Sequence, residues 1–250
     1  SRWPIARGQA RSLLFAALLV ASLPAISLSG GFDRGAAKAA SSTDTDEDLS
    51  PYVFVKSGSS VNKVDSTTDS VVDSIAFPSN IDAMTVDKGE YIYAIDTNGN
   101  IKKINPSTMS VETENNISGG YTDMEYMNGS IYAIYSHTLV EIDAETLEIA
   151  NETSGLGSYS VLHTLVPNYD DGELYMTTGR EDYTHDFLRV DGGTHEILAH
   201  QTVSRAPWAD NLAYSPDHGL IGFPYDGVGY QMKEYDPETL ELVQAHSSIQ

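Results

Sequence analysis

The 250-residue chain contains no cysteine and only two tryptophans. The absence of cysteine excludes disulfide bonds, thiolate catalysis and zinc sites built on thiolates. Such a protein is held together by core packing or by bound ions. Basic residues are also scarce, with 14 Lys and Arg against 36 Asp and Glu, which gives a formal net charge of −22.

The N-terminal segment has the opposite charge balance to the rest of the chain. Residues 1–40 hold five basic side chains and one acidic one, a balance of +4, so the rest of the chain carries −26. A surface of this charge repels nucleic acid and anionic lipid, so we expect neither as a partner. Salt screens the self-repulsion, because the Debye length falls to about 3 Å at 1 M. The charge favours a halophilic protein over an ordinary acidic surface protein.

Residues 1–39 are typical of a signal peptide or an N-terminal anchor. Arg2, Arg7 and Arg11 precede the apolar run 12–21, and a small-residue cleavage pattern follows at Ala37-Lys38-Ala39. We expect a protein that is secreted or held at the cell surface, with no membrane contact beyond this segment.

The next eleven residues are polar. Residues 40–50 form an acidic linker without core-forming content, and residues 51–250 remain as the folded domain. This assignment predicts three parts: the N-terminal segment, the linker and one large domain.

Helical periodicity is absent after position 50, whereas one turn motif recurs five times. In each copy a strand-like segment ends in Asp or Asn, and Thr follows three positions later. The Asp or Asn positions are 65, 105, 143, 191 and 236, at spacings of 40, 38, 48 and 45 residues. Asp or Asn at the start of a turn accepts hydrogen bonds from the amides just ahead. We therefore interpret these residues as turn formers, and we predict that the Thr starts the return strand.

A second hairpin precedes each of these turns. Asn128-Gly129, for example, separates the segments 121–127 and 131–134, and Asn-Gly between apolar alternations is a strong hairpin signal. Radial repetition of four short antiparallel strands protects most strand edges. The sequence therefore predicts an all-β fold, a β-propeller of four-stranded antiparallel blades with about five blade units.

The first unit, residues 51–80, supplies only three strands and lacks an innermost one. The chain ends just after an outermost strand at 242–246, and the next strand would be an innermost one. Two interpretations remain, a C-terminal truncation of a six- to eight-bladed ring or a five-bladed ring without its closing strand. The strand count favours truncation.

Two stretches resemble a known repeat. The run 174–179, followed by 188–191 and Thr194, resembles the YVTN-type propeller repeat, and so does 91–95 with 104–108. The quinoprotein-like propellers are similar as well. The resemblance covers the predicted domain and implies an architecture rather than an activity.

Two sets of loops line the channel mouth of a propeller, those leading into the innermost strands and those between the second and third strands. Ligand sites commonly lie on such loops above a rigid scaffold. The predicted ligand-binding residues at this mouth are Asp82, Tyr121, Asp123, His137, Tyr159, Arg180, His185, Trp208, Asp210 and Tyr225.

The longest of these loops, residues 179–186, places carboxylates beside an imidazole. A hard cation such as Ca²⁺ would accept the carboxylates, and a histidine suits a transition metal. The alternative is a solvated polar loop, the default on an acidic surface. The predicted metal ligands are Glu181, Asp182, His185 and Asp186.

The sequence contains no serine elbow, phosphate-binding glycine loop or nucleotide fingerprint. We therefore predict a non-catalytic binding or scaffold module at the cell surface, with a protein, a glycan or an ion as its partner. The alternative is a propeller enzyme of lactonase, lyase or quinoprotein dehydrogenase type, with its site at the channel mouth. Loop side chains converging on a cofactor would indicate the enzyme, and a diffuse acidic mouth would indicate the scaffold.

Overall fold

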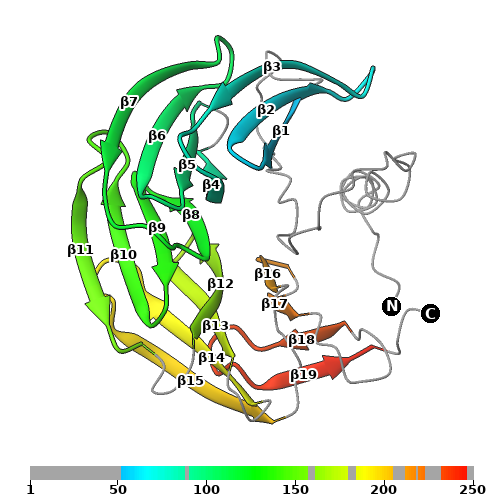
Figure 1. Ribbon diagram of the computed structural model, residues 1–250. Coiled ribbons are helices and arrows are strands. Elements are labelled where there is room, and N and C mark those ends of the chain that lie inside the picture. The colour runs from blue at the N-terminus through cyan, green and yellow to red at the C-terminus, as the bar shows by residue number, and fades with distance from the viewer. Residues whose placement is uncertain are drawn as a thin grey trace. The chain divides into compact units, whose positions relative to one another are not determined.

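Five antiparallel sheets follow one another in chain order along residues 52–246 (Figure 1). The computed structural model describes residues 52–87, 90–156, 161–179, 184–204, 212–217, 219–222 and 232–246. Strands are the regular elements of these residues, which include no helix long and apolar enough to cross a bilayer. The predicted N-terminal segment 1–39 and linker 40–50 lie outside the described residues.

Each sheet is one blade, numbered here in chain order. Blade 1 has the strands β1 (Tyr52–Ser57), β2 (Ser60–Asp65) and β3 (Ser70–Ala76). Blade 2 has β4 (Ile81–Val86), β5 (Ile92–Asp96), β6 (Asn100–Asn105) and β7 (Ser110–Asn116). Blade 3 has β8 (Asp123–Met127), β9 (Ser130–Tyr135), β10 (Thr138–Asp143) and β11 (Ile149–Ser154). Blade 4 has β12 (Val161–Asn168), β13 (Glu173–Gly179), β14 (Thr184–Asp191) and β15 (Ile197–Ser204). Blade 5 has β16 (Leu212–Ser215), β17 (Gly219–Gly222), β18 (Lys233–Tyr235) and β19 (Leu242–Ala245).

The first strands of consecutive blades contact one another. β4 lies against β8, β8 against β12, and β12 against β16. The fourth strands β7, β11 and β15 lie on the outside of the arrangement (Figure 1). Blades that meet at their first strands and diverge outward form a β-propeller, so the predicted fold class is confirmed.

Blade 1 differs from the other four because it has three strands. β1 pairs with β2, and β2 reaches β3 through the first Asp turn, so the three strands correspond to the second to fourth strands elsewhere. The predicted lack of an innermost strand is confirmed for the described residues. Every residue of β5 is buried, whereas the residues of its equivalent β1 are half-buried or exposed. β5 is flanked by a strand on both edges, and β1 is paired on one edge within the described part of the chain.

The recurring turns, called Asp/Asn turns below, join the third and fourth strands of each blade. The Asp143 carboxylate accepts hydrogen bonds from the amides of Glu145, at 3.0 Å, and Thr146, at 2.7 Å. Asp191 and Asp236 accept the equivalent pairs. These bonds favour the ionised carboxylate and lower the pKa of Asp143. The interpretation of these residues as turn formers is confirmed.

The prediction that the Thr starts the return strand is wrong. Thr146 stays in the turn, where its hydroxyl donates to the Asp143 carboxylate at 2.9 Å. The next residue, Leu147, has a φ of +58°, and the pairing of β10 with β11 then shifts by one residue, which makes a β-bulge. The same shift occurs in all five blades. The positive-φ residues that follow the Thr are Asp69, Met109, Leu147, His195 and Leu240.

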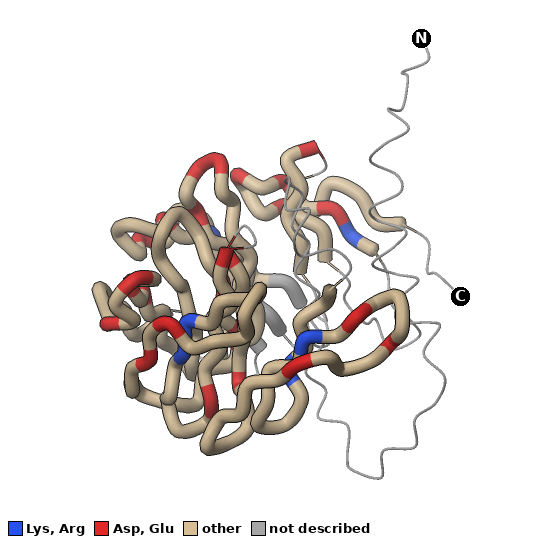
Figure 2. The backbone as a smooth tube through the Cα atoms, turned by 90° about the horizontal axis from the view of Figure 1, so that it is seen from above, with Lys and Arg blue, Asp and Glu red and all other residues tan. Residues whose placement is uncertain are grey.

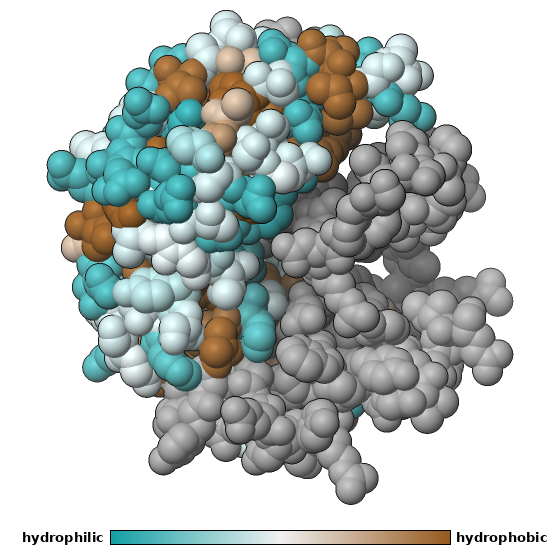
Figure 3. Space-filling model, viewed as in Figure 1, coloured by the Kyte–Doolittle hydropathy of each residue, from teal (hydrophilic) through white to brown (hydrophobic). Residues whose placement is uncertain are grey.

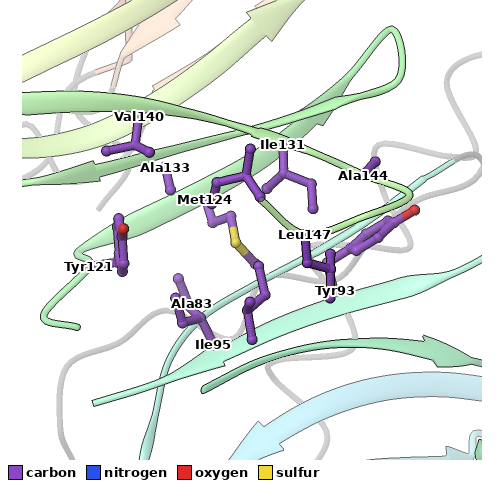
Figure 4. Packing of buried hydrophobic residues seen from close by; sticks show 12 residues of the cluster. Ala83, Tyr93, Ile95, Tyr121, Met124, Ile131, Ala133, Val140, Ala144 and Leu147 are labelled. Atoms are coloured by element: carbon purple, nitrogen blue, oxygen red, sulfur yellow. The ribbon is translucent and has the colours of Figure 1, made fainter. Parts of the chain in front are cut away.

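The core lies between adjacent blades rather than in one central mass. Figure 4 shows the cluster shared by blades 2 and 3, where Tyr93 and Ile95 of β5 face Met124 of β8 and Leu147 of the Asp/Asn turn. Full burial of a side chain of this size stabilises a fold by about 1.5–3 kcal/mol. The face seen in Figure 3 is mostly hydrophilic, with separate apolar patches. Contacts between blades therefore carry most of the hydrophobic stabilisation.

Candidate functional site

The predicted site residues divide into those that the structure describes and those that it does not. Asp82, Tyr121, Asp123, His137 and Asp186 are described. Outside the described residues lie Tyr159, Arg180, Glu181, Asp182, Trp208, Asp210 and Tyr225. His185 belongs to β14, but its side chain also lies outside the described part.

Asp82 and Asp123 lie where the chain enters two adjacent innermost strands, β4 and β8. Asp82 is the extra residue of a bulge between β4 and β5, and His163 takes the same place between β12 and β13. The Lys56 ammonium of blade 1 donates to the Asp82 carbonyl oxygen. The structure therefore brings part of the predicted set to the same end of neighbouring strands.

The Asp123 carboxylate holds two blades together. Its Oδ2 accepts a hydrogen bond from the Leu165 amide of β12 at 2.9 Å, and its Oδ1 accepts from the Met124 amide at 2.9 Å. The Thr122 hydroxyl beside it donates to the Leu162 carbonyl at 3.0 Å. These bonds satisfy backbone groups on the open edge of an innermost strand. Asp123 thus has a structural task in the described chain.

Tyr121 and His137 lie close to the same end. Tyr121 is buried, its hydroxyl lies 3.1 Å from that of Ser118, and its ring meets the Tyr135 ring edge-on at 5.3 Å. Burial raises the pKa of Tyr121, so the phenol stays neutral. His137 forms the β9–β10 turn with a half-buried side chain, and its carbonyl accepts from the Leu156 amide at 3.1 Å. Tyr121 is a core residue, whereas His137 is half-buried, with its Nδ1 enclosed and without a hydrogen-bond partner among the described residues.

Asp186, the described member of the predicted metal set, is buried between the third and fourth strands of blade 4. Its carboxylate accepts a hydrogen bond from the Thr202 hydroxyl at 2.7 Å and lies 3.1 Å from His200 Nε2. Its amide donates to the Thr178 hydroxyl at 3.1 Å. Across the described ranges, no three His, Asp or Glu side chains are grouped so as to hold a metal. The metal site thus stays a prediction that rests on residues 181–185.

One recurring contact escaped the sequence analysis. A charged residue of the third strand reaches the Asp/Asn turn of the next blade. In blade 2, Lys103 pairs with Glu145 of blade 3 at 2.7 Å and lies 4.1 Å from the centre of the Tyr91 ring. The equivalent contacts are Lys63 to the Pro106 carbonyl at 3.0 Å and Arg189 to the Glu238 carbonyl at 3.2 Å.

Blade 3 differs. The third-strand residue is Glu141, and it faces His195, the fourth residue after the Asp of the next turn, with 4.0 Å between Glu141 Oε2 and His195 Nε2. Aligning the five copies on the Asp or Asn identifies the shared strand position. The third-strand residues are Lys63, Lys103, Glu141, Arg189 and Glu234. The recurring charged position could thus have been found in the sequence, but its contact with the next blade could not.

Acidic residues outnumber basic ones along the described backbone (Figure 2). Asp and Glu are spread over many segments, whereas Lys and Arg occur at few places, and three of these cations make the contacts between blades. Of the predicted mouth carboxylates, that of Asp123 binds backbone amides.

Comparison with known proteins finds similarity at the level of the fold. No protein-family model matches the chain, and no curated protein matches it. Among solved structures it is similar to hydrazine synthase of Kuenenia stuttgartiensis, with a TM-score of 0.66 at 13% identity, over 84% of this chain and 66% of that chain. It is also similar to the β-propeller domain of Myceliophteria thermophila Cps50 (Swd1), with a TM-score of 0.63 at 12% identity, over 79% of this chain and 69% of that one.

A third similar structure is the WD40 β-propeller domain of Doa1, with a TM-score of 0.61 at 13% identity, over 78% of this chain and 64% of that chain. The chain thus spans about two thirds of the length of the structures that it resembles. At such low identities the likeness shows the fold alone, and it agrees with the blades described above.

Proposed function

We propose that this β-propeller is exported and acts at the cell surface as a non-catalytic module that binds a partner protein. The observation that carries the proposal is the use of Asp123. Both oxygens of this carboxylate accept backbone amides, one of them from the next blade, so the side chain is used to hold the blades together. The described part of the mouth therefore offers a shaped acidic surface rather than a reaction centre.

The N-terminal sequence supports export. A basic start followed by an apolar run is the pattern of a secretory signal, and a protein without cysteine has no need of disulfide formation outside the cell. The net charge of −22 supports solubility in a salty medium, where screening limits self-repulsion.

A protein partner is favoured over a glycan or an ion. WD40 domains are among the structures that the chain resembles, which supports a scaffold that presents loops to another protein. We also assign the repeat to the YVTN type, on the stretches 91–95 and 174–179 described above. The acidic surface favours a partner with a basic patch, since complementary charge speeds encounter.

Cell fractionation tests the export. The full chain, followed by an antibody, is expected in the envelope or medium, and a variant lacking residues 1–39 is expected to stay in the cytoplasm. A full-length chain that remains in the cytoplasm overturns the localisation.

Binding to isolated envelopes tests the partner. Labelled protein is expected to be retained by untreated envelopes and lost after the envelopes are treated with protease. Retention that survives protease but not periodate would indicate a glycan instead, and no retention at any salt concentration would contradict a surface module.

A propeller enzyme is the competing function, because the first similar structure carries the name of a synthase. Elemental analysis of protein purified from its own cells separates the two. A stoichiometric redox-active metal or organic cofactor would favour the enzyme, whereas Ca²⁺ alone would fit the predicted site of the binding module. Scattering and circular dichroism against salt test the halophilic prediction, in which the chain is compact in molar salt and expanded in dilute buffer.

A further inference from the structure

The inference concerns His195 and the boundary between blades 3 and 4, called the blade 3–4 seam below. The imidazole is wholly buried at 0% side-chain exposure, and Nε2 has no hydrogen-bond partner among the described residues. Nδ1 lies 3.1 Å from the Thr153 hydroxyl of β11. A polar ring is therefore buried with one of its two nitrogens unsatisfied, which is costly.

The same slot is apolar in three other blades. The residue with positive φ after the Thr is Met109 in blade 2, Leu147 in blade 3 and Leu240 in blade 5, and all three are buried. Packing against the preceding blade therefore calls for an apolar side chain here. His195 fills a position that is occupied by an apolar side chain in the other four-stranded blades.

Three titratable groups face the imidazole, one from each of three elements. Glu141 of β10 presents Oε2 at 4.0 Å, while its Oε1 accepts from the Ser130 hydroxyl at 2.7 Å. Tyr132 of β9 lies edge-on at 6.2 Å between ring centres, and burial raises its pKa to about 12, so it stays neutral. Asp191, in the same turn as His195, is ionised because its backbone hydrogen bonds lower its pKa.

We propose that the blade 3–4 seam is a proton-operated contact: protonation of His195 loosens the Asp/Asn turn of blade 4 from blade 3. A charged imidazole carries a proton on both nitrogens. Nε2 would then need solvent or a direct hydrogen bond, but the side chain is enclosed and the nearest carboxylate oxygen, on Glu141, lies 4.0 Å away. Blades 2 and 3 are joined through Lys103, whose ammonium makes its ion pair with Glu145 directly, at 2.7 Å. The chain thus has one acid-sensitive seam beside an insensitive one.

Burial sets the sign of the effect. Desolvation lowers the pKa of His195, and the carboxylates of Glu141 and Asp191 oppose it with smaller effects. The unfolded chain protonates a histidine near pH 6.5. Below that pH the unfolded state binds more protons than the folded state, so stability falls as pH falls. The dependence ends below the folded pKa, where both states are protonated.

Urea unfolding of the full chain between pH 7.5 and 5.5, at a fixed 1 M KCl, tests the proposal. The unfolding constant of the wild type is expected to rise with acid by up to about tenfold per pH unit more than that of His195→Leu. Leucine fits because Leu147 and Leu240 already fill this slot. His195→Gln, which is polar but does not titrate, gives the same comparison if the leucine variant fails to fold.

Glu141→Gln separates this proposal from its opposite. If burial controls the seam, removing the carboxylate keeps or steepens the pH dependence. If a buried ion pair instead tightens the seam in acid, the wild type is more stable at pH 5.5 than at pH 7.5. Glu141→Gln then flattens the dependence of stability on pH. That outcome overturns the proposal. So does a result in which the unfolding constants of the wild type and His195→Leu depend equally on pH.

Amide exchange locates the effect. The His195 amide donates to the Asp191 carbonyl at 2.8 Å, and the Leu147 amide donates to the Asp143 carbonyl at 2.8 Å in the matching turn of blade 3. After correction for intrinsic rates, acid is expected to lower the protection of His195 by several-fold relative to Leu147. Equal loss at both amides would contradict a change confined to the blade 3–4 seam.

Discussion

The contact between blades 2 and 3 and the contact between blades 3 and 4 start from the same third-strand position but reach different positions of the Asp/Asn turn. In the first, Lys103 of the third strand meets Glu145 in the turn, and the positive-φ residue Leu147 is apolar. In the second, the acid is Glu141 on the strand and the base is His195 in the turn. The turn therefore offers the preceding blade two contact positions: the second residue after the Asp, which is Glu145, and the fourth, which is His195.

The same comparison explains how the cost of burial differs. Lys103 is buried to 5% exposure, but its ammonium reaches Glu145, which is 81% exposed and hydrated. His195 has no such exit, since its side chain is fully enclosed. The long lysine stem carries its charge to an exposed carboxylate, whereas the short imidazole reaches no such partner.

Removing the apolar side chain from the first contact has the largest expected effect. Leu147→Ala should destabilise the protein by about 3 kcal/mol, since Leu-to-Ala changes in cores cost 2–5 kcal/mol. Both residues carry a Cβ at the same positive φ, so backbone strain is unchanged. Urea unfolding measures the loss. The matched control is Asp69→Ala at the exposed equivalent position in blade 1, where a loss below about 1 kcal/mol is expected.

Crowding the second contact comes next. A Cβ on Gly192 would lie 2.7 Å from the Gly172 carbonyl oxygen and 2.7 Å from Met127 Cε of blade 3. Gly192→Ala should therefore destabilise the protein by about 2 kcal/mol through overpacking. The neighbouring Gly193→Ala is the control, because its Cβ would meet only the Asp191 carboxylate, at 3.6 Å. Equal melting temperatures for the two variants would show that the blades do not approach as described.

Neutralising the lysine has a smaller effect. Lys103→Met keeps the apolar stem over Tyr91 and removes the charge, so a loss of about 1 kcal/mol is expected from the cation–π and ion-pair contacts together. The measurement is again the midpoint of urea unfolding, compared between proteins whose unfolding free energies depend equally steeply on urea. If Lys103→Met is more stable than the wild type, the desolvation of the ammonium costs more free energy than its ion-pair and cation–π contacts contribute.

Changing the exposed partner has the smallest effect. Glu145→Gln should cost less than about 0.5 kcal/mol in dilute buffer and nothing measurable at 1 M salt, because an exposed carboxylate in an ion pair is screened. A salt-independent loss would indicate that Glu145 has a structural role beyond the pair.

The fold was largely predictable and the contacts between blades were not. Regular turn spacing and two-residue periodicity predict antiparallel blades, and local chemistry predicts that Asp143 accepts the amides ahead of it. The bulge after Thr146 was missed because it depends on a positive φ at Leu147, a conformation that leucine rarely adopts. Nothing local in the sequence marks that residue as an exception.

The roles of the candidate site residues were harder to predict from the sequence, for a different reason. The prediction placed Asp123 correctly near the start of an innermost strand, but it gave that carboxylate to a ligand. Its amide partner Leu165 lies 42 residues away in another blade, so only the three-dimensional arrangement reveals the bond. Asp186 is comparable, because its partners His200 and Thr202 come from the adjacent strand of the same blade.

Cross-linking between blades tests the central claim most directly, because the chain has no native cysteine. A protein with Lys103→Cys and Glu145→Cys is treated with a short bifunctional maleimide, beside a control with Lys103→Cys and Thr194→Cys. If each third strand contacts the turn of the next blade, the first pair cross-links within one chain and the control does not. Efficient linkage of the control pair, or none in the first, would contradict the order of blades on which the account depends.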